Sequence, residues 1–83
     1  MRAQDVLRDD VDQAKFNGVT VRKGSVGAFL ANARTLTDPT ASPTERAAAE
    51  RDVIEILPVL RALGLFEVLE IRNKELRAFV DAH

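Results

Sequence analysis

The chain of 83 residues has no cysteine, tryptophan or tyrosine, and its single histidine is the last residue. Without cysteine there can be no disulfide framework, no thiolate nucleophile and no thiolate metal site, so metal binding would depend on carboxylates alone. The aromatic residues that most often anchor interfaces or stack on nucleotide bases are also missing. We therefore expect no metal and no cofactor, and a cytoplasmic location by default.

An excess of charge of either sign is absent as well. Twelve basic and thirteen acidic side chains give a net charge of -1, which supplies no overall field to attract nucleic acid or an anionic membrane. A nucleic-acid site could use only the few cations Arg22, Lys23 and Arg34, so we expect none. The sequence also lacks any run of about eighteen apolar residues, and its start, MRAQDVLRDDVD, lacks the apolar core of a signal peptide. We expect neither export by that route nor a membrane span.

Hydrophobic residues make up 46% of the chain and charged residues 30%, which is enough apolar material for a core and argues against intrinsic disorder. The length fits one domain over residues 1–83. A chain this short buries only about 60 to 65% of its unfolded surface, so its stability margin is thin. Self-association would add the burial that a single copy lacks, and we expect a homo-oligomer or a protein partner.

The N-terminal third predicts a helix, a turn and a strand. Apolar residues recur at helical spacing from Ala3 to Lys15, whereas the Asn17-Gly18 pair is a strong turn signal. Val19–Arg22 then alternates apolar and polar residues and is rich in β-branched side chains, which favours a short strand. Its best partner is Phe66–Ile71, although the apolar residues there also fit helical spacing.

Three further helices are expected. Ser25 would cap a helix whose apolar stripe is Val26, Phe29, Leu30, Ala33 and Leu36. After an internal linker at residues 37–43, the capping box of Ser42 and Glu45 starts a long helix at Pro43, with a kink or restart at Pro58 and an end at Gly64. Its apolar stripe is Ala49, Val53, Ile56, Leu57, Leu60 and Leu63. A last helix should run from Lys74 to Ala82.

These elements predict an α+β fold that is mostly helical, with about four helices and a short two-stranded sheet in which Val19–Arg22 pairs with Phe66–Ile71. The alternative is an all-α small helical domain, because short apolar runs fit either kind of element. Gly27 lies inside the second expected helix, and we attribute it to close packing rather than to ligand contact.

One cluster of residues suggests a ligand site. Arg22, Lys23, Gly24 and Ser25 place two cations, a glycine and a hydroxyl just before a helix N-terminus, where amide hydrogens and the helix dipole favour an anion. The spacing differs from that of a phosphate-binding loop. The same residues could instead serve only as a turn and a cap, with the cations in surface ion pairs.

No catalytic constellation is visible, because Ser25 would need a base and the only histidine is the terminal His83. We therefore predict a small non-enzymatic binding or assembly module of bacterial-cytosol type that associates with itself through an apolar helix face. The alternative is a small-anion or nucleotide-phosphate binder at Arg22, Lys23, Gly24 and Ser25.

Overall fold

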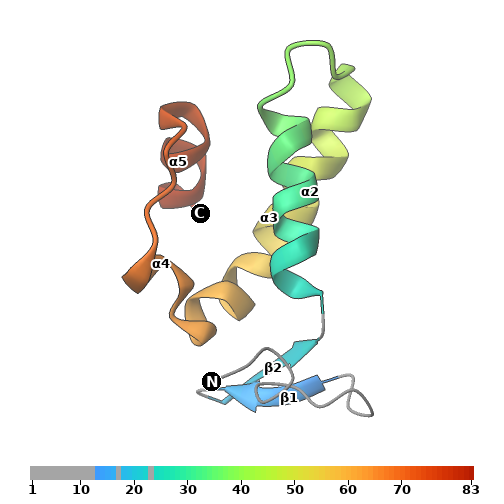
Figure 1. The fold of residues 1–83 in the computed structure, drawn as a ribbon. Coiled ribbons are helices and arrows are strands. Elements are labelled where there is room, and N and C mark those ends of the chain that lie inside the picture. The colour runs from blue at the N-terminus through green and yellow to red at the C-terminus, as the bar shows by residue number, and fades with distance from the viewer. Residues whose placement is uncertain (1–12, 17, 23) are drawn as a thin grey trace.

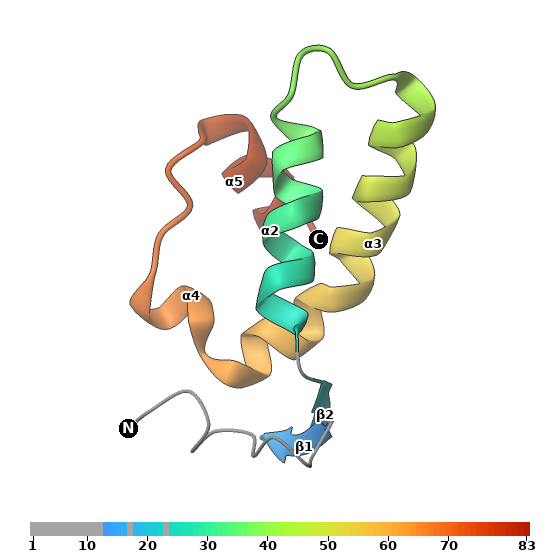
Figure 2. The same ribbon diagram turned by 45° about the vertical axis from the view of Figure 1, so that its right-hand side comes forward.

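Two antiparallel helices form the body of the protein in the computed structural model, which describes residues 13–16, 18–22 and 24–83. They are α2 (Ser25–Leu36) and α3 (Pro43–Leu63), and they lie side by side in Figures 1 and 2. A short helix, α4 (Leu65–Val68), an extended stretch and the last helix, α5 (Lys74–Asp81), complete this body. The strands β1 (Gln13–Phe16) and β2 (Val19–Arg22) precede it.

The start of α3 confirms the predicted capping box. The Glu45 amide donates to Ser42 Oγ at 3.1 Å, the Ser42 amide donates to a Glu45 carboxylate oxygen at 3.4 Å, and Pro43 occupies the first helical position. The helix does not restart at Pro58 but continues to Leu63, and Figure 2 shows it bending in its last turns. It ends, as predicted, at Gly64, which has a left-handed φ of 80°.

The connection between α2 and α3 is fastened by one side chain. The Arg46 guanidinium donates to the backbone carbonyl oxygens of Asp38 at 2.6 Å, Ala41 at 3.3 Å and Leu36 at 3.4 Å. Asp38 also organises the turn, because its carboxylate accepts from the Thr40 amide at 2.9 Å and from the Thr40 hydroxyl at 2.7 Å. These bonds hold the C-terminal end of α2 next to the N-terminal end of α3.

The core lies where α2, α3 and α5 meet. Its buried cluster is Phe29, Ala33, Val53, Leu57, Leu60, Leu76 and Val80. Most of the apolar stripe predicted for α3 is buried, and Val53 and Leu60 have no exposed surface. The stripe predicted for α2 is covered only in part, since Phe29 and Ala33 are buried while Val26 and Leu30 remain 37% and 51% exposed. One side of α2 therefore faces outward with apolar side chains.

The predicted sheet is wrong, and the α+β fold class with it. Phe66–Ile71 contains no strand: α4 continues to Val68, and the chain beyond runs extended without a paired neighbour among the described residues. The body from Gly24 onward is helical, as in the all-α alternative. The outcome has a physical reason: Gly64 ends α3 and its carbonyl accepts from the Glu67 amide at 3.1 Å, so the next residues complete a helical turn.

Val19–Arg22 instead belongs to a local hairpin at the end of the body where α2 begins (Figure 1). β2 pairs antiparallel with β1, with Phe16 opposite Val19 and Gln13 opposite Arg22. β1 and β2 are close in sequence, so closing the connection between them costs little chain entropy compared with pairing to a distant segment. The helix predicted for Ala3–Lys15 is wrong at its end, where β1 begins at Gln13, and residues 3–12 lie outside the described part.

Candidate functional site

The predicted anion site lies between the hairpin and α2. β2 ends at Arg22, Lys23 lies outside the described residues, and Gly24 takes the N-cap position of α2 with φ of 82°. The prediction that Ser25 caps this helix is wrong, because Gly24 is the N-cap and Ser25 is already the first helical residue. A left-handed N-cap suits glycine, which has no Cβ to strain. Anion binding at these residues stays a prediction.

A different surface stands out in the structure, because it exposes large apolar side chains. Val26 and Leu30 on α2 are 37% and 51% exposed, and Val68 and Leu69 at the end of α4 are 83% and 59% exposed. We call these four residues the apolar patch. Leucine and valine side chains each lose about 1.5 to 3 kcal/mol of potential stabilisation when they stay in water, so such a cluster is typical of a docking surface.

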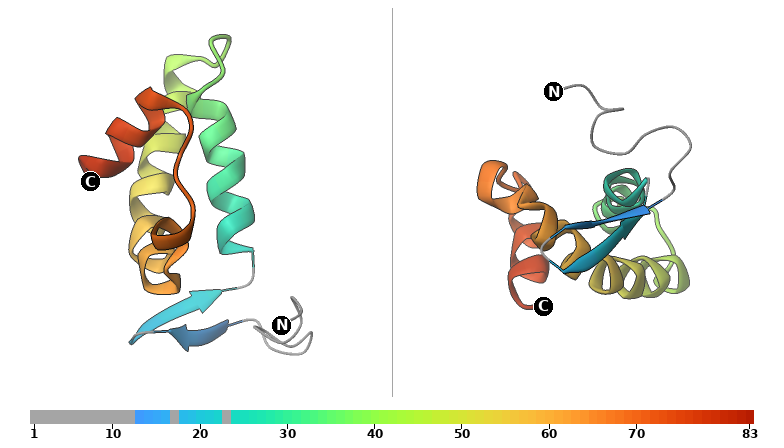
Figure 3. Two further views of the ribbon diagram at one scale, coloured as in Figure 1. Left: turned by 60° about the vertical axis from the view of Figure 1, so that its left-hand side comes forward. Right: turned by 90° about the horizontal axis from the view of Figure 1, so that it is seen from below.

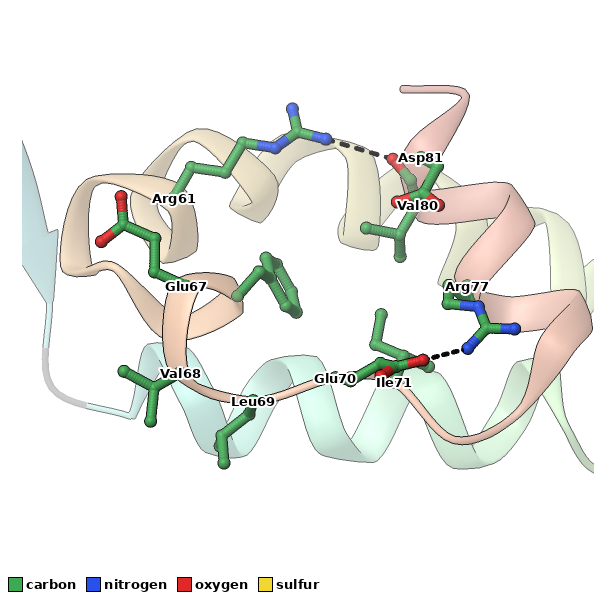
Figure 4. A pocket seen from close by; sticks show the side chains of 10 residues that line it. Arg61, Glu67, Val68, Leu69, Glu70, Ile71, Arg77, Val80 and Asp81 are labelled. Carbon is green, nitrogen blue, oxygen red and sulfur yellow. Dashed lines mark hydrogen bonds and ion pairs between the residues drawn. The ribbon is translucent and has the colours of Figure 1, made fainter.

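The two halves of the apolar patch are held together by an aromatic contact. The rings of Phe29 on α2 and Phe66 on α4 meet edge to face, with centroids 5.8 Å apart and an interplanar angle of 72°. Val26 and Leu30 flank Phe29 on one side of α2, since residues three and four positions apart share a helix face. Figure 4 shows Val68 and Leu69 pointing to the side where α2 runs. The patch therefore spans α2 and the end of α4.

A groove with a cavity volume of about 470 Å³ lies next to the apolar patch, and its lining includes Val68 and Leu69. Figure 4 shows it between α5 and the stretch that carries Val68, Leu69 and Glu70. Its cationic side chains already have partners. Arg61 donates to the carbonyl oxygens of Val80 at 3.1 Å and His83 at 3.2 Å, and Arg77 forms an ion pair with Glu70. The two arginines of the groove therefore hold α5 in place, and both are already engaged by groups of the protein itself.

Between α4 and α5 the chain is extended, and we call residues Leu69–Asn73 the extended linker (Figure 3). Its ends have extended backbone angles, with φ and ψ of −116° and 141° at Leu69 and −74° and 121° at Asn73. The Leu69 amide donates to the Leu65 carbonyl, and the Asn73 carbonyl accepts from the Arg77 amide, both at 2.9 Å.

The middle of the extended linker is different. In the described part of the chain, the backbone groups of Glu70, Ile71 and Arg72 form no hydrogen bond. The sequence did not predict this feature, because Glu70 and Ile71 were assigned to the paired strand Phe66–Ile71. The alternation of Leu69, Glu70, Ile71 and Arg72 could have indicated an extended edge, but not that the edge has no backbone partner among the described residues.

In the described part of the chain, the histidine and the acidic residues are not grouped into a metal or catalytic site. His83 closes the end of α5, where its Nδ1 lies 2.8 Å from the Phe79 carbonyl oxygen and its ring lies 4.5 Å from the Phe79 ring. Over residues 13–16, 18–22 and 24–83, no three histidine or acidic side chains are grouped as metal ligands would be. Within the same ranges, no helix is both long and apolar enough to cross a membrane.

Comparison of the chain with protein-family models, with curated proteins and with solved structures gave no match.

Proposed function

We propose that this protein is a small non-enzymatic binding module that associates with itself through the apolar patch. The observation that carries the proposal is the exposure of four large apolar side chains, Val26 and Leu30 on α2 and Val68 and Leu69 at the end of α4. In the described part of the chain, the buried core does not include these four side chains. Covering them in a dimer adds burial that so short a chain needs.

The charge distribution is compatible with this role. The net charge of -1 produces little repulsion between two copies, and the apolar patch itself contains no charged side chain. A two-fold arrangement would place the same patch on both copies in contact, which is the most common symmetry of small assemblies.

Sedimentation velocity over a range of protein concentrations tests the proposal. The wild-type chain should shift from monomer toward dimer as the concentration rises, and Leu30→Glu should remain monomeric because it buries a charge in the interface. Ile54→Glu is the matched control, since Ile54 is a 40% exposed apolar residue of α3 outside the patch. A wild-type chain that stays monomeric throughout contradicts the proposal, as does equal loss of dimer in both variants.

A second proposal is a small-anion or nucleotide-phosphate site at Arg22, Lys23, Gly24 and Ser25. It is supported by Gly24 at the N-cap of α2, since glycine has no side chain with which to cap the first-turn amides. Titration with phosphate, sulfate and nucleotides should shift the amide resonances of residues 24 to 27, and Lys23→Ala should weaken the effect. Unchanged resonances, or shifts that Lys23→Ala leaves unaltered, would contradict it.

A further inference from the structure

We infer that the extended linker is a pairing strand for a second copy of this chain, in an antiparallel two-fold arrangement centred on Ile71. The inference rests on the proposed self-association and specifies how the two copies meet. Its starting point is the edge formed by Glu70, Ile71 and Arg72, whose backbone groups have no hydrogen-bond partner among the described residues. An extended edge of this kind is a template for another strand.

The ends of the extended linker define how long that strand can be. The Leu69 amide and the Asn73 carbonyl are already used by α4 and α5, so the residues available for pairing lie between them. Because the helices on both sides fix these ends, the strand is ordered before a partner arrives. Preorganisation of this kind lowers the entropy cost of association.

The charges of Glu70 and Arg72 favour a second copy of this chain as the pairing partner, and they determine the register of the two strands. When an antiparallel pair is centred on Ile71, Glu70 lies opposite Arg72 of the second copy, and by symmetry Arg72 lies opposite Glu70 of that copy. Centring on Glu70 would oppose two carboxylates, and centring on Arg72 would oppose two guanidinium groups, both of which destabilise a strand pair. The tripeptide Glu70-Ile71-Arg72 is therefore complementary to itself only in the register centred on Ile71.

Backbone hydrogen bonds fit the same register. The Glu70 N–H would donate to the Arg72 C=O of the second copy, and the Glu70 C=O would accept from the Arg72 N–H of that copy. By symmetry, Arg72 would form the same two bonds with Glu70 of the second copy. Ile71 then faces its own equivalent as a non-hydrogen-bonded pair. The Glu70 side chain forms an ion pair with Arg77 but is 77% exposed, so it can also contact Arg72 of a second copy.

Leu69 connects the extended linker to the apolar patch. Leu69 is 59% exposed and belongs to the patch, whereas Ile71 packs against the core of its own copy. Figure 4 shows the Leu69 side chain on the side where α2 runs and the Ile71 side chain directed into the groove. Because Leu69 is only two residues from Ile71, pairing centred on Ile71 would bring the patch close to the second copy.

Charge reversal in the full chain tests the register. Glu70→Arg alone and Arg72→Glu alone each place like charges opposite one another twice, so each should raise the dimer dissociation constant about tenfold. The double variant restores opposite charges and should return the constant to within about threefold of wild type. Arg77→Ala removes only the internal ion pair of Glu70 and is the control, which should leave the constant unchanged.

A second measurement locates the strand directly. In a dimer mixed from isotope-labelled and unlabelled chains, the Hα protons of the two Ile71 residues should give an intermolecular NOE. If the wild-type chain dimerises but lacks this NOE and is insensitive to the charge reversals, the strand pairing is overturned and the proposed self-association stands. If the wild-type chain does not dimerise at any concentration, both are overturned.

Discussion

The ring of Phe66 packs edge to face against the ring of Phe29, and this contact fixes α4 and the start of the extended linker beside α2. Phe29 is 5% exposed and belongs to the buried core, so Phe66, together with Leu65, attaches the α4 region to that core. The position of Val68 and Leu69 relative to Val26 and Leu30 depends on this pair.

Replacing Phe66 by alanine should therefore destabilise the fold by about 2 kcal/mol, since it removes a partly buried ring and an aromatic pair. Chemical denaturation monitored by far-UV circular dichroism measures this change. Val68→Ala is the control from the same helix, and at a protein concentration where the chain is monomeric it should change the free energy of unfolding by less than about 0.5 kcal/mol, because Val68 is 83% exposed. Equal effects of the two substitutions would contradict the assigned packing.

Two glycines should respond to alanine in opposite directions. Gly64 has φ of 80°, and an added Cβ would lie 3.0 Å from a Glu67 carboxylate oxygen, so Gly64→Ala should cost about 1 to 2 kcal/mol. Gly27 lies inside α2, where an added Cβ would meet no atom within 4 Å. Gly27→Ala should therefore raise the free energy of unfolding by about 0.4 to 1 kcal/mol. Thermal unfolding of both variants checks the signs, and stabilisation by Gly64→Ala would be inconsistent with a left-handed helix end.

Arg46→Lys should destabilise the α2–α3 connection by about 1 to 2 kcal/mol although the charge is kept, because a single ammonium group cannot replace the guanidinium bonds to Asp38, Ala41 and Leu36. Urea unfolding measures the change. Arg51→Lys, at an exposed position of the same helix, should have almost no effect. A loss of the same size in both variants would argue against the three bonds as the cause.

The Asp38 carboxylate should titrate below its ordinary pKa of 3.8, first because it accepts from the Thr40 amide, then because it accepts from the Thr40 hydroxyl and lies near Arg46. A lowered pKa favours the charged form in the folded protein, so its contribution to stability is present above pH 3.8 and is lost as the pH falls through the folded pKa. NMR titration of the Asp38 carboxyl carbon measures the midpoint. Thr40→Val should move the midpoint upward, and a wild-type midpoint at or above 3.8 would contradict the assignment.

Local signals made the helical part of the fold predictable. The Ser42–Glu45 capping box and the end of α3 at Gly64 depend on residues close in sequence, and the structure has both. The partner of Val19–Arg22 was mispredicted because alternation identifies an extended segment without identifying its neighbour. The short sequence separation between Val19–Arg22 and β1 decided the pairing instead.

The candidate site was less predictable for a related reason. Helical spacing placed Val26 and Leu30 on the same stripe as Phe29, but it could not show how much of that stripe so small a core covers. Gly27 was attributed to packing, yet nothing packs against it in the described structure. Charge identified Arg22 and Lys23 as a candidate site, whereas the extended linker was missed because its open edge is a property of the tertiary structure.

Concentration-dependent hydrogen exchange of the Glu70 and Arg72 amides tests the central claim most directly. If two copies cover the extended linker, these amides should exchange slowly at concentrations where the dimer is populated and rapidly after dilution to monomer, while amides of the α3 core keep the same protection. Exchange at Glu70 and Arg72 that stays fast at every concentration, in samples where sedimentation shows a dimer, would contradict the account.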